Sequence, residues 1–260
     1  LFFLNSKGEL WKEVDLMRSL PRDSIWYNEL GSSYFSKMNT SGNSIVLGLN
    51  AAIHPKIRSK KGIQYYTEGV WSKAQFVRFD SIFSDQILPS LAFPMYQAIE
   101  ATDSSLLNIE IKSFVVTEEV VYAHSYYSNR IFKLDAYTLT LLQTFELESD
   151  FKKLGERVDT KGKSDAEILT LMKRKKGGGM IARHFFNEWK GHHYFVISID
   201  DQHWTLLIYD ESLHRIGEQK LSDEEYLPFV LPSRRGLYLQ RAATTQFYKN
   251  QTLLFHEFTY

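Results

Sequence analysis

A short apolar run that ends in Asp or Asn, followed by Leu at a fixed distance, recurs along the chain and constrains its fold. The distance is eleven residues in three copies and twelve in a fourth. The Asp or Asn side chain can bond the backbone two residues on, so it ends a strand and starts a turn. We therefore predict four hairpins in four different sheets. The copies are Leu1-Phe-Phe-Leu-Asn5 to Leu16, Phe76-Val-Arg-Phe-Asp80 to Leu91, Ile131-Phe-Lys-Leu-Asp135 to Leu147, and Leu206-Leu-Ile-Tyr-Asp210 to Leu221.

Further strand candidates lie upstream of most hairpins. Units of about four antiparallel strands, repeated along a chain, make up the blades of a β-propeller. The four marker residues are 75, 55 and 75 residues apart, whereas a blade usually spans roughly 40 to 50, so the excess predicts insertions. We predict an all-β fold in which residues 1–260 form one β-propeller domain of four-stranded antiparallel blades. The candidates are Tyr34 to Met38, Ser44 to Leu49, Phe114 to Thr117, Val120 to Ser125, Met180 to Phe186, Tyr194 to Ile199 and Leu237 to Arg241.

One insertion, Ser149 to Gly179, carries a helix signal. Ser164 is followed three residues later by Glu167, which is the spacing of a capping box, and apolar residues at near-helical spacing follow. We predict a short helix over Ser164 to Lys176, outside the propeller ring.

The chain ends in a fifth copy of the pattern, Leu253 to Phe258, which has no return strand after it. An unpaired strand edge is a pairing hazard, and propellers close their ring with a strand from the other terminus. Since Leu1 already belongs to its own hairpin, we expect an N-terminal segment before Leu1 to complete this blade. Five markers in the chain and one in that segment predict six blades.

Composition removes several classes of function. Lys and Arg total 31 and Asp and Glu total 31, so the chain lacks the basic balance of a general nucleic-acid binder. It has no Cys, which excludes a disulfide framework and a cysteine nucleophile within these residues. No apolar run reaches the roughly 18 residues of a transmembrane segment. Aromatic residues make up 15% of the chain, in short runs of the kind that strands favour.

These strands resemble the blades of a TolB-like six-bladed β-propeller, and the chain is most similar to a family of exported bacterial lipoproteins of unknown function. The resemblance implies an extracytoplasmic location, in the periplasm or on the outer surface, and a tether at an N-terminal Cys, which this chain lacks. We expect a monomer. The residues that carry the resemblance are Ser128 to Asp135, Trp204 to Asp210, Arg235 to Leu239, and the Phe93-Pro94 step.

Histidines and charge clusters are interpreted as structural. Adjacent strand residues point to opposite faces, so His192 and His193 could not easily bind one metal ion, and we predict a hairpin-turn pair. His124 and His203 are expected to be structural or surface residues. We expect no metal and no cofactor, and no catalytic residue can be selected. Lys173 to Lys176, Asp200-Asp201, Glu118-Glu119 and Glu224-Glu225 are likewise expected in solvated ends or turns.

Aromatic residues on loops are candidates for ligand contact, because they offer rigid area to sugars or peptides. The alternative, packing between blades, is the commoner role of such residues. The leading hypothesis is a non-catalytic β-propeller that binds a protein or a glycan at the cell envelope. The alternative is a propeller hydrolase or lyase that acts on a glycan or peptide in the central channel, since the fold hosts both. The candidate aromatics are Tyr65, Tyr66, Tyr126, Tyr127 and Trp189.

Overall fold

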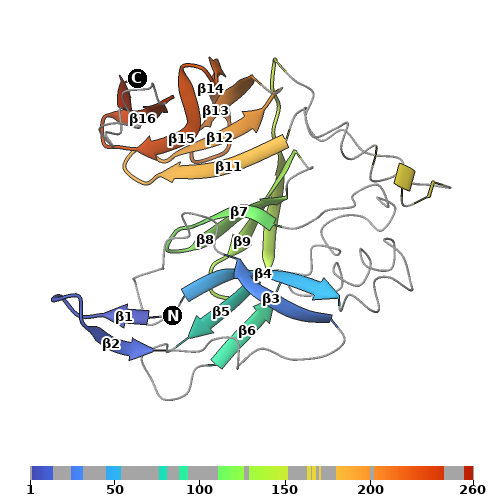
Figure 1. Ribbon diagram of the computed structural model, residues 1–260, viewed down its shortest axis with the longest axis vertical. Coiled ribbons are helices and arrows are strands. Elements are labelled where there is room, and N and C mark those ends of the chain that lie inside the picture. Colours follow the sequence, from blue (N-terminus) through green and yellow to red (C-terminus); the bar gives the residue numbers. More distant parts are fainter. Residues whose placement is uncertain are drawn as a thin grey trace. The chain divides into compact units, whose positions relative to one another are not determined.

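The computed structural model describes residues 2–13, 25–31, 45–53, 76–80, 88–92, 111–125, 129–151, 163–164, 166–167, 170, 180–199, 202–242 and 255–259. Within these ranges the chain forms seventeen β-strands (Figure 1). It divides into two compact units: residues 1–103, 116–122 and 133–142 in one, and residues 104–115, 123–132 and 143–260 in the other.

The strands form small sheets in which neighbours in the sheet are also neighbours in the chain (Figure 1). Three sheets have four strands, one has three and one has two among the described residues. Each pairing with a described register is antiparallel. Four-stranded antiparallel sheets in chain order are what a propeller blade contains. The chain is all-β and resembles a β-propeller, as predicted; the six-blade count and the single domain stay predictions.

The sheets are composed as follows. The two-stranded sheet is β1 (Phe2–Leu4) and β2 (Leu10–Glu13); the first four-stranded sheet is β3 (Ile25–Gly31), β4 (Ile45–Ile53), β5 (Phe76–Asp80) and β6 (Leu88–Ala92); the second is β7 (Ile111–Val116), β8 (Val120–Ser125), β9 (Arg130–Asp135) and β10 (Leu141–Glu146); the third is β11 (Met180–Asn187), β12 (His192–Ser198), β13 (His203–Tyr209) and β14 (Arg215–Ser222); and the three-stranded sheet is β15 (Tyr226–Pro232), β16 (Gly236–Arg241) and β17 (Phe255–Thr259).

The four predicted hairpins are β1–β2, β5–β6, β9–β10 and β13–β14, and they lie in four different sheets, which confirms the repeat. The capping role of the Asp or Asn residue is also confirmed where the turn is described. Asn5 Oδ1 accepts hydrogen bonds from the backbone N–H of Lys7 and Glu9 at 2.9 and 3.0 Å. Asp210 Oδ1 accepts one from His214 at 2.8 Å. The turn after Asp80 lies outside the described residues.

Each of the three described turns, after Asn5, Asp135 and Asp210, contains one residue with left-handed backbone. That residue donates its N–H to the carbonyl oxygen of the capping residue. The first turn places a glycine there, which has no Cβ to clash. The other two place a buried leucine there, at an energetic cost. The pairs are Gly8 (φ 79°) with Asn5, Leu139 (φ 55°) with Asp135, and Leu213 (φ 61°) with Asp210.

Two strands were not predicted. In β3 the register shifts between Tyr27 and Glu29, and in β15 it shifts between Tyr226 and Val230. A bulge interrupts the alternation of side chains that marks a strand in the sequence, and β15 also contains two prolines. Proline is tolerated in edge strands, and β15 is the edge of its sheet. The predicted strand Tyr34 to Met38 lies outside the described residues.

The capping box of the predicted helix is present. Glu167 Oε2 accepts hydrogen bonds from the backbone N and the Oγ of Ser164, at 2.8 and 2.7 Å. Ser164 Oγ accepts a longer one, 3.4 Å, from the N–H of Glu167. Most of the remaining stretch up to Lys176 lies outside the described residues, so the length of the helix stays a prediction.

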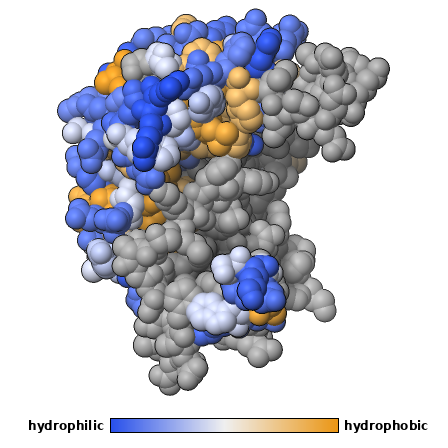
Figure 2. Space-filling model, turned by 90° about the vertical axis from the view of Figure 1, so that its left-hand side faces the viewer, coloured by the Kyte–Doolittle hydropathy of each residue, from blue (hydrophilic) through white to orange (hydrophobic). Residues whose placement is uncertain are grey.

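Exposed apolar side chains occur at separate places among the described residues. On the face that Figure 2 shows, the coloured surface is mostly hydrophilic with separate hydrophobic spots. Several sit on the last strand of a sheet: Trp11 on β2, Leu142 on β10 and Ile216 on β14 are 62%, 55% and 51% exposed. Single exposed apolar residues are normal on soluble proteins. These positions therefore do not define a binding surface.

Candidate binding site

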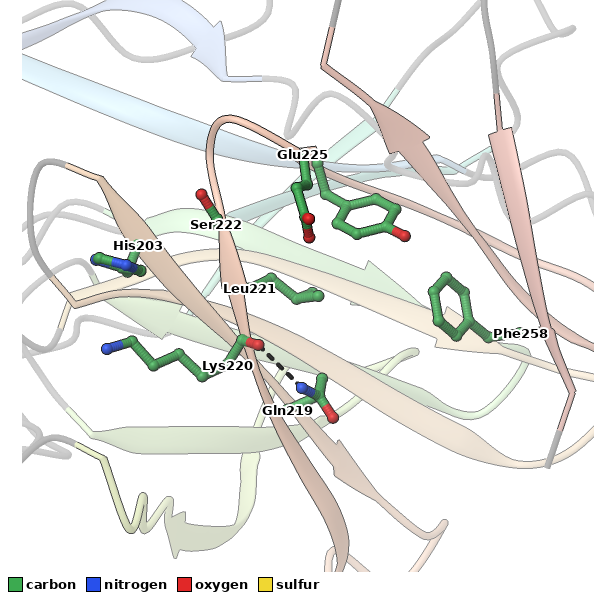
Figure 3. A pocket seen from close by; sticks show the side chains of 8 residues that line it. His203, Gln219, Lys220, Leu221, Ser222, Glu225 and Phe258 are labelled. Atoms are coloured by element: carbon green, nitrogen blue, oxygen red, sulfur yellow. Dashed lines mark hydrogen bonds between the residues drawn. The ribbon is translucent and has the colours of Figure 1, made fainter.

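A pocket of about 610 Å³ opens beside β14 and the start of the three-stranded sheet (Figure 3). This volume lies in the range of small-ligand sites. Strands β13, β14, β15 and β17 contribute to it, together with the turn between β14 and β15. The lining residues are His203, Gln219, Lys220, Leu221, Ser222, Glu225, Tyr226 and Phe258.

The pairing of β13 with β14 decides which side chains point towards the three-stranded sheet. Trp204 pairs with Leu221 and Leu206 pairs with Gln219, so these four residues share one face because side chains alternate along strands. Lys220 belongs to the opposite face, and Figure 3 shows its side chain extending away from Phe258. The Gln219 amide donates to the carbonyl of Lys220 over 2.9 Å, which fixes the amide at the pocket wall.

The rings of Tyr226 and Phe258 line the pocket, and the His256 ring packs against both of them; we call these three residues the aromatic shelf. His256 and Phe258 alternate on β17 and so share a face. The ring centroid of Tyr226 lies 5.6 Å from that of His256 and 6.0 Å from that of Phe258. The Tyr226 hydroxyl and His256 Nδ1 are 2.7 Å apart and hydrogen-bonded. The shelf is partly exposed, since 36% of Phe258 is accessible.

The pocket rests on a hydrophobic core between the two sheets. Leu221 belongs to that core and Tyr226 packs against it. Trp204 is buried, with 2% of the residue exposed. Its indole Nε1 donates a hydrogen bond to the backbone carbonyl of Tyr226 over 3.0 Å. A buried donor bonded to the backbone of a lining residue holds that residue in place. The other core members are Phe185, Tyr194, Val196, Leu206, Val230, Leu237 and Leu239.

The pocket therefore offers ring surfaces beside polar groups of both kinds. The Gln219 amide can donate and accept, the Glu225 carboxylate accepts, and the Ser222 hydroxyl does both. Of the described residues that line the pocket, Glu225 is the one that carries a carboxylate. This arrangement can bind a neutral polar ligand with an apolar face.

Trp189, the sequence candidate that falls within the described residues, lies away from the pocket. Trp189 is 52% exposed in the turn between β11 and β12. That turn is at the Tyr209 end of its sheet, while the pocket is at the His203 end. The pairs Tyr65-Tyr66 and Tyr126-Tyr127 lie outside the described residues. The structure thus does not bring Trp189 to the pocket.

Two interpretations of charged residues can be compared with the structure. Glu118 and Glu119 are exposed in the turn between β7 and β8, as predicted. Glu224 and Glu225 are exposed in the turn between β14 and β15, also as predicted, but Glu225 lines the pocket, which the sequence did not indicate. The stretches Lys173 to Lys176 and Asp200-Asp201 lie outside the described residues.

The histidine pair was assigned to a turn, and this was wrong. His192 and His193 begin strand β12, after the turn formed by residues 188–191. They do point to opposite faces: His193 is fully buried and His192 is half-buried. Within the described parts of the chain, no group of three His, Asp or Glu side chains is placed to hold a metal ion. None of the described helices is long and apolar enough to span a membrane.

The fold and the site define an all-β protein of blade-like sheets with a surface pocket. No protein-family model matches the sequence, and no curated protein matches it. Its fold is similar to the crystal structure of a member of the DUF4221 family from Bacteroides vulgatus, with TM-score 0.51 and 12% identity, over 76% of this chain and 55% of that one.

A second similar structure is the β-propeller domain of Cps50 (Swd1) from Myceliophteria thermophila. Its TM-score is 0.32 at 12% identity, over 81% of this chain and 52% of that one; a likeness this weak carries no argument. The chain spans about half the length of these two structures. At such identity the likeness to the DUF4221 member concerns the fold alone.

Proposed function

We propose that this chain is a non-catalytic binding protein on a β-propeller scaffold, and that the pocket between β14 and β17 binds a glycan. The observation that carries the proposal is that two rings of the aromatic shelf, Tyr226 and Phe258, line the same pocket as an amide and a carboxylate. A sugar ring has an apolar face that can lie on aromatic side chains and hydroxyls that need both donors and acceptors. Gln219, Ser222 and Glu225 supply those groups at the pocket.

The same proposal includes the setting of the protein. We propose an exported, monomeric protein at the cell envelope, folded as a six-bladed propeller with one helical insertion. The resemblance of its strands to those of exported lipoproteins supports this setting. A glycan ligand fits it, because envelope proteins meet polysaccharides outside the cytoplasm.

A glycan-cleaving enzyme is less well supported by the pocket. Most glycoside hydrolases place a pair of carboxyl groups about 5 to 10 Å apart across the scissile bond. Among the described lining residues only Glu225 has a carboxylate, and it is exposed. The pocket therefore favours binding over hydrolysis.

Calorimetric titration of the chain with a panel of short neutral oligosaccharides tests the proposal. We expect at least one to bind, and Phe258→Ala to weaken that binding by at least about fivefold. Trp189→Ala is the matched control, because it also removes a partly exposed aromatic side chain but lies at the other end of the third sheet. Its affinity should equal that of the wild type.

Two outcomes contradict the proposal. If the wild-type chain binds no oligosaccharide, or if Trp189→Ala weakens binding as much as Phe258→Ala, the pocket is not a glycan site. Chromatography of the titrated sugars provides the second check, since shortened products would show that the chain is an enzyme. Binding of a peptide library in place of the sugars would assign the pocket to a protein partner.

A further inference from the structure

Three buried imidazoles meet inside the larger compact unit, and we call His124, His184 and His193 the histidine cluster. They come from β8, β11 and β12 and are 0%, 2% and 0% exposed. The His184 and His193 rings have centroids 5.2 Å apart, and those of His124 and His184 are 6.3 Å apart. The cluster therefore joins a strand of the second sheet to two strands of the third.

One hydrogen bond inside the cluster depends on protonation. His184 Nε2 and His193 Nδ1 are 3.0 Å apart. A neutral imidazole has one donor and one acceptor nitrogen, whereas a protonated one has two donors. This bond therefore requires an acceptor nitrogen from at least one neutral ring. If both rings were protonated, two N–H groups and two positive charges would face each other.

The described surroundings of the cluster are aromatic. Phe195 stacks on His184 at 4.3 Å, and Phe186 lies 4.7 Å from His193. Burial lowers the pKa of His184, and the His193 and His124 imidazoles both lower it further, because a positive charge on either would repel a proton on it. Tyr209 on β13 contacts Phe195, and its hydroxyl bonds the backbone of Glu148. A second proton in the cluster would place two positive charges side by side in a buried environment, where like charges repel strongly.

We propose that the histidine cluster is an acid-sensitive latch, which holds β8 to β11 and β12 while its rings are neutral and opens when they take up protons. It concerns residues outside the glycan pocket and does not depend on the proposed function. Buried histidines that must become charged are a recognised cause of acid unfolding, and the transition falls in the pH range where histidine ordinarily titrates.

The direction in which stability changes with pH follows from the number of protons that the folded and unfolded states bind. Burial, with His193 and His124 adding to it, lowers the pKa of His184 well below its usual value. In the unfolded chain the same side chain binds a proton below about pH 6.5. The unfolded state then holds more protons than the folded state, so stability is complete above that pH and falls as the pH drops below it.

Urea unfolding of the full 260-residue chain at steps from about pH 7.5 to about pH 5 tests the latch. For the wild type we expect the folding equilibrium constant to fall steeply below about pH 6.5. His184→Gln keeps a neutral hydrogen-bonding side chain but removes one proton-binding group. Its folding equilibrium constant should therefore fall less steeply than that of the wild type, by up to about a factor of ten per pH unit. The control is His214→Gln, because the His214 side chain is 80% exposed and its 3.3 Å pair with Asp210 is a surface ion pair of small energy. This variant should stay close to the wild type.

Equal pH dependence of His184→Gln and the wild type would overturn the proposal. Because that variant could fail to fold, NMR titration of the wild-type imidazole signals gives an independent result. We expect the three cluster rings to remain neutral until the protein unfolds. Titration of these rings near pH 6.5 within the folded protein would show that they are no latch.

Discussion

Arg78 Nη1 donates a hydrogen bond to the backbone carbonyl oxygen of Ala136, over 2.7 Å. The guanidinium also pairs with Asp80 at 2.7 Å and lies 4.8 Å above the ring of Tyr137. Arg78 is on β5, while Ala136 and Tyr137 form the turn after β9. A buried arginine, 8% exposed, thus connects one repeat hairpin to the next one along the chain.

Replacing Arg78 by Met should lower the free energy of unfolding by about 2 to 4 kcal/mol, because the Ala136 carbonyl loses a charged donor in a buried place. Chemical denaturation measures the change. Arg130→Met is the control, because Arg130 makes a more exposed ion pair with Glu146 at 3.3 Å, worth less than about 1 kcal/mol. Equal losses in the two variants would mean that Arg78 does not hold the hairpins together.

Gly236 allows β16 and β17 to approach each other. A Cβ atom at this position would fall far inside van der Waals contact with the carbonyl oxygen of Phe258. Gly236→Ala should therefore separate the strands and destabilise the protein by about 1 to 3 kcal/mol. Gly217→Ala is the matched control, since its Cβ would meet Ile208 at an ordinary 3.6 Å.

Amide hydrogen exchange measures whether Gly236→Ala loosens strand β17. Amides of Phe255 to Thr259 should exchange faster in Gly236→Ala and at the wild-type rate in Gly217→Ala. Because Phe258 is on β17, the first variant should also weaken glycan binding. Unchanged exchange in β17 would contradict the prediction.

The turn after β9 depends on the side-chain oxygen of Asp135. Its Oδ1 accepts hydrogen bonds from the backbone N–H of Tyr137 and Thr138, at 2.9 and 2.7 Å. Asp135→Ala should lower the melting temperature, whereas Asp135→Asn should retain most of it, because Asn5 makes the same kind of turn in the first repeat. Equal melting temperatures for the Ala and Asn variants would show that the acceptor is not needed.

The stability that the Asp135 carboxylate gives to this turn decreases at acidic pH. Hydrogen bonds from Thr138, first from its backbone and then from its side chain, lower the pKa of the Asp135 carboxyl. A carboxyl group whose pKa is lowered on folding stabilises the protein at pH values above its pKa in the unfolded chain, about 3.9. This stability is lost as the pH falls through the pKa of the folded protein. Asp135→Asn should lack this loss, and melting curves at acidic pH measure the difference.

Trp204 should matter for both stability and the pocket. Trp204→Phe keeps a buried ring but removes the 3.0 Å bond from Nε1 to the carbonyl of Tyr226. We expect a loss of about 1 to 2 kcal/mol in unfolding free energy and a weaker glycan affinity. Trp11→Phe is the control, because Trp11 is 62% exposed on β2. An unchanged affinity in Trp204→Phe would show that the shelf does not depend on this bond.

The hairpins could be predicted from the sequence because each depends on a local signal. An Asp or Asn side chain bonds residues that are two to four positions away, so the strand end and the turn are both visible in a short window. Strand β15 could not be predicted in the same way. Its prolines and its shifted register remove the local signal, and only its pairing with β16 defines it.

The pocket could not be predicted because its parts are distant in sequence. Gln219, Tyr226 and Phe258 come from three strands, and their proximity depends on how two sheets pack. The one available signal was the alternation of His256 and Phe258 on the predicted last strand, which places them on one face without showing what that face meets. The burial of His184 and His193 depended on sheet packing in the same way.

The left-handed leucines of the turns bear on how far such a sequence can diverge. Leu139 and Leu213 occupy the place that Gly8 holds in the first turn, so the turn does not require glycine once the capping side chain holds the loop. In the three described turns the short polar side chain at the strand end is common, whereas the residue with left-handed backbone differs. A hairpin built this way can keep its turn when the left-handed residue changes from glycine to leucine, so similar hairpins need not have similar turn sequences.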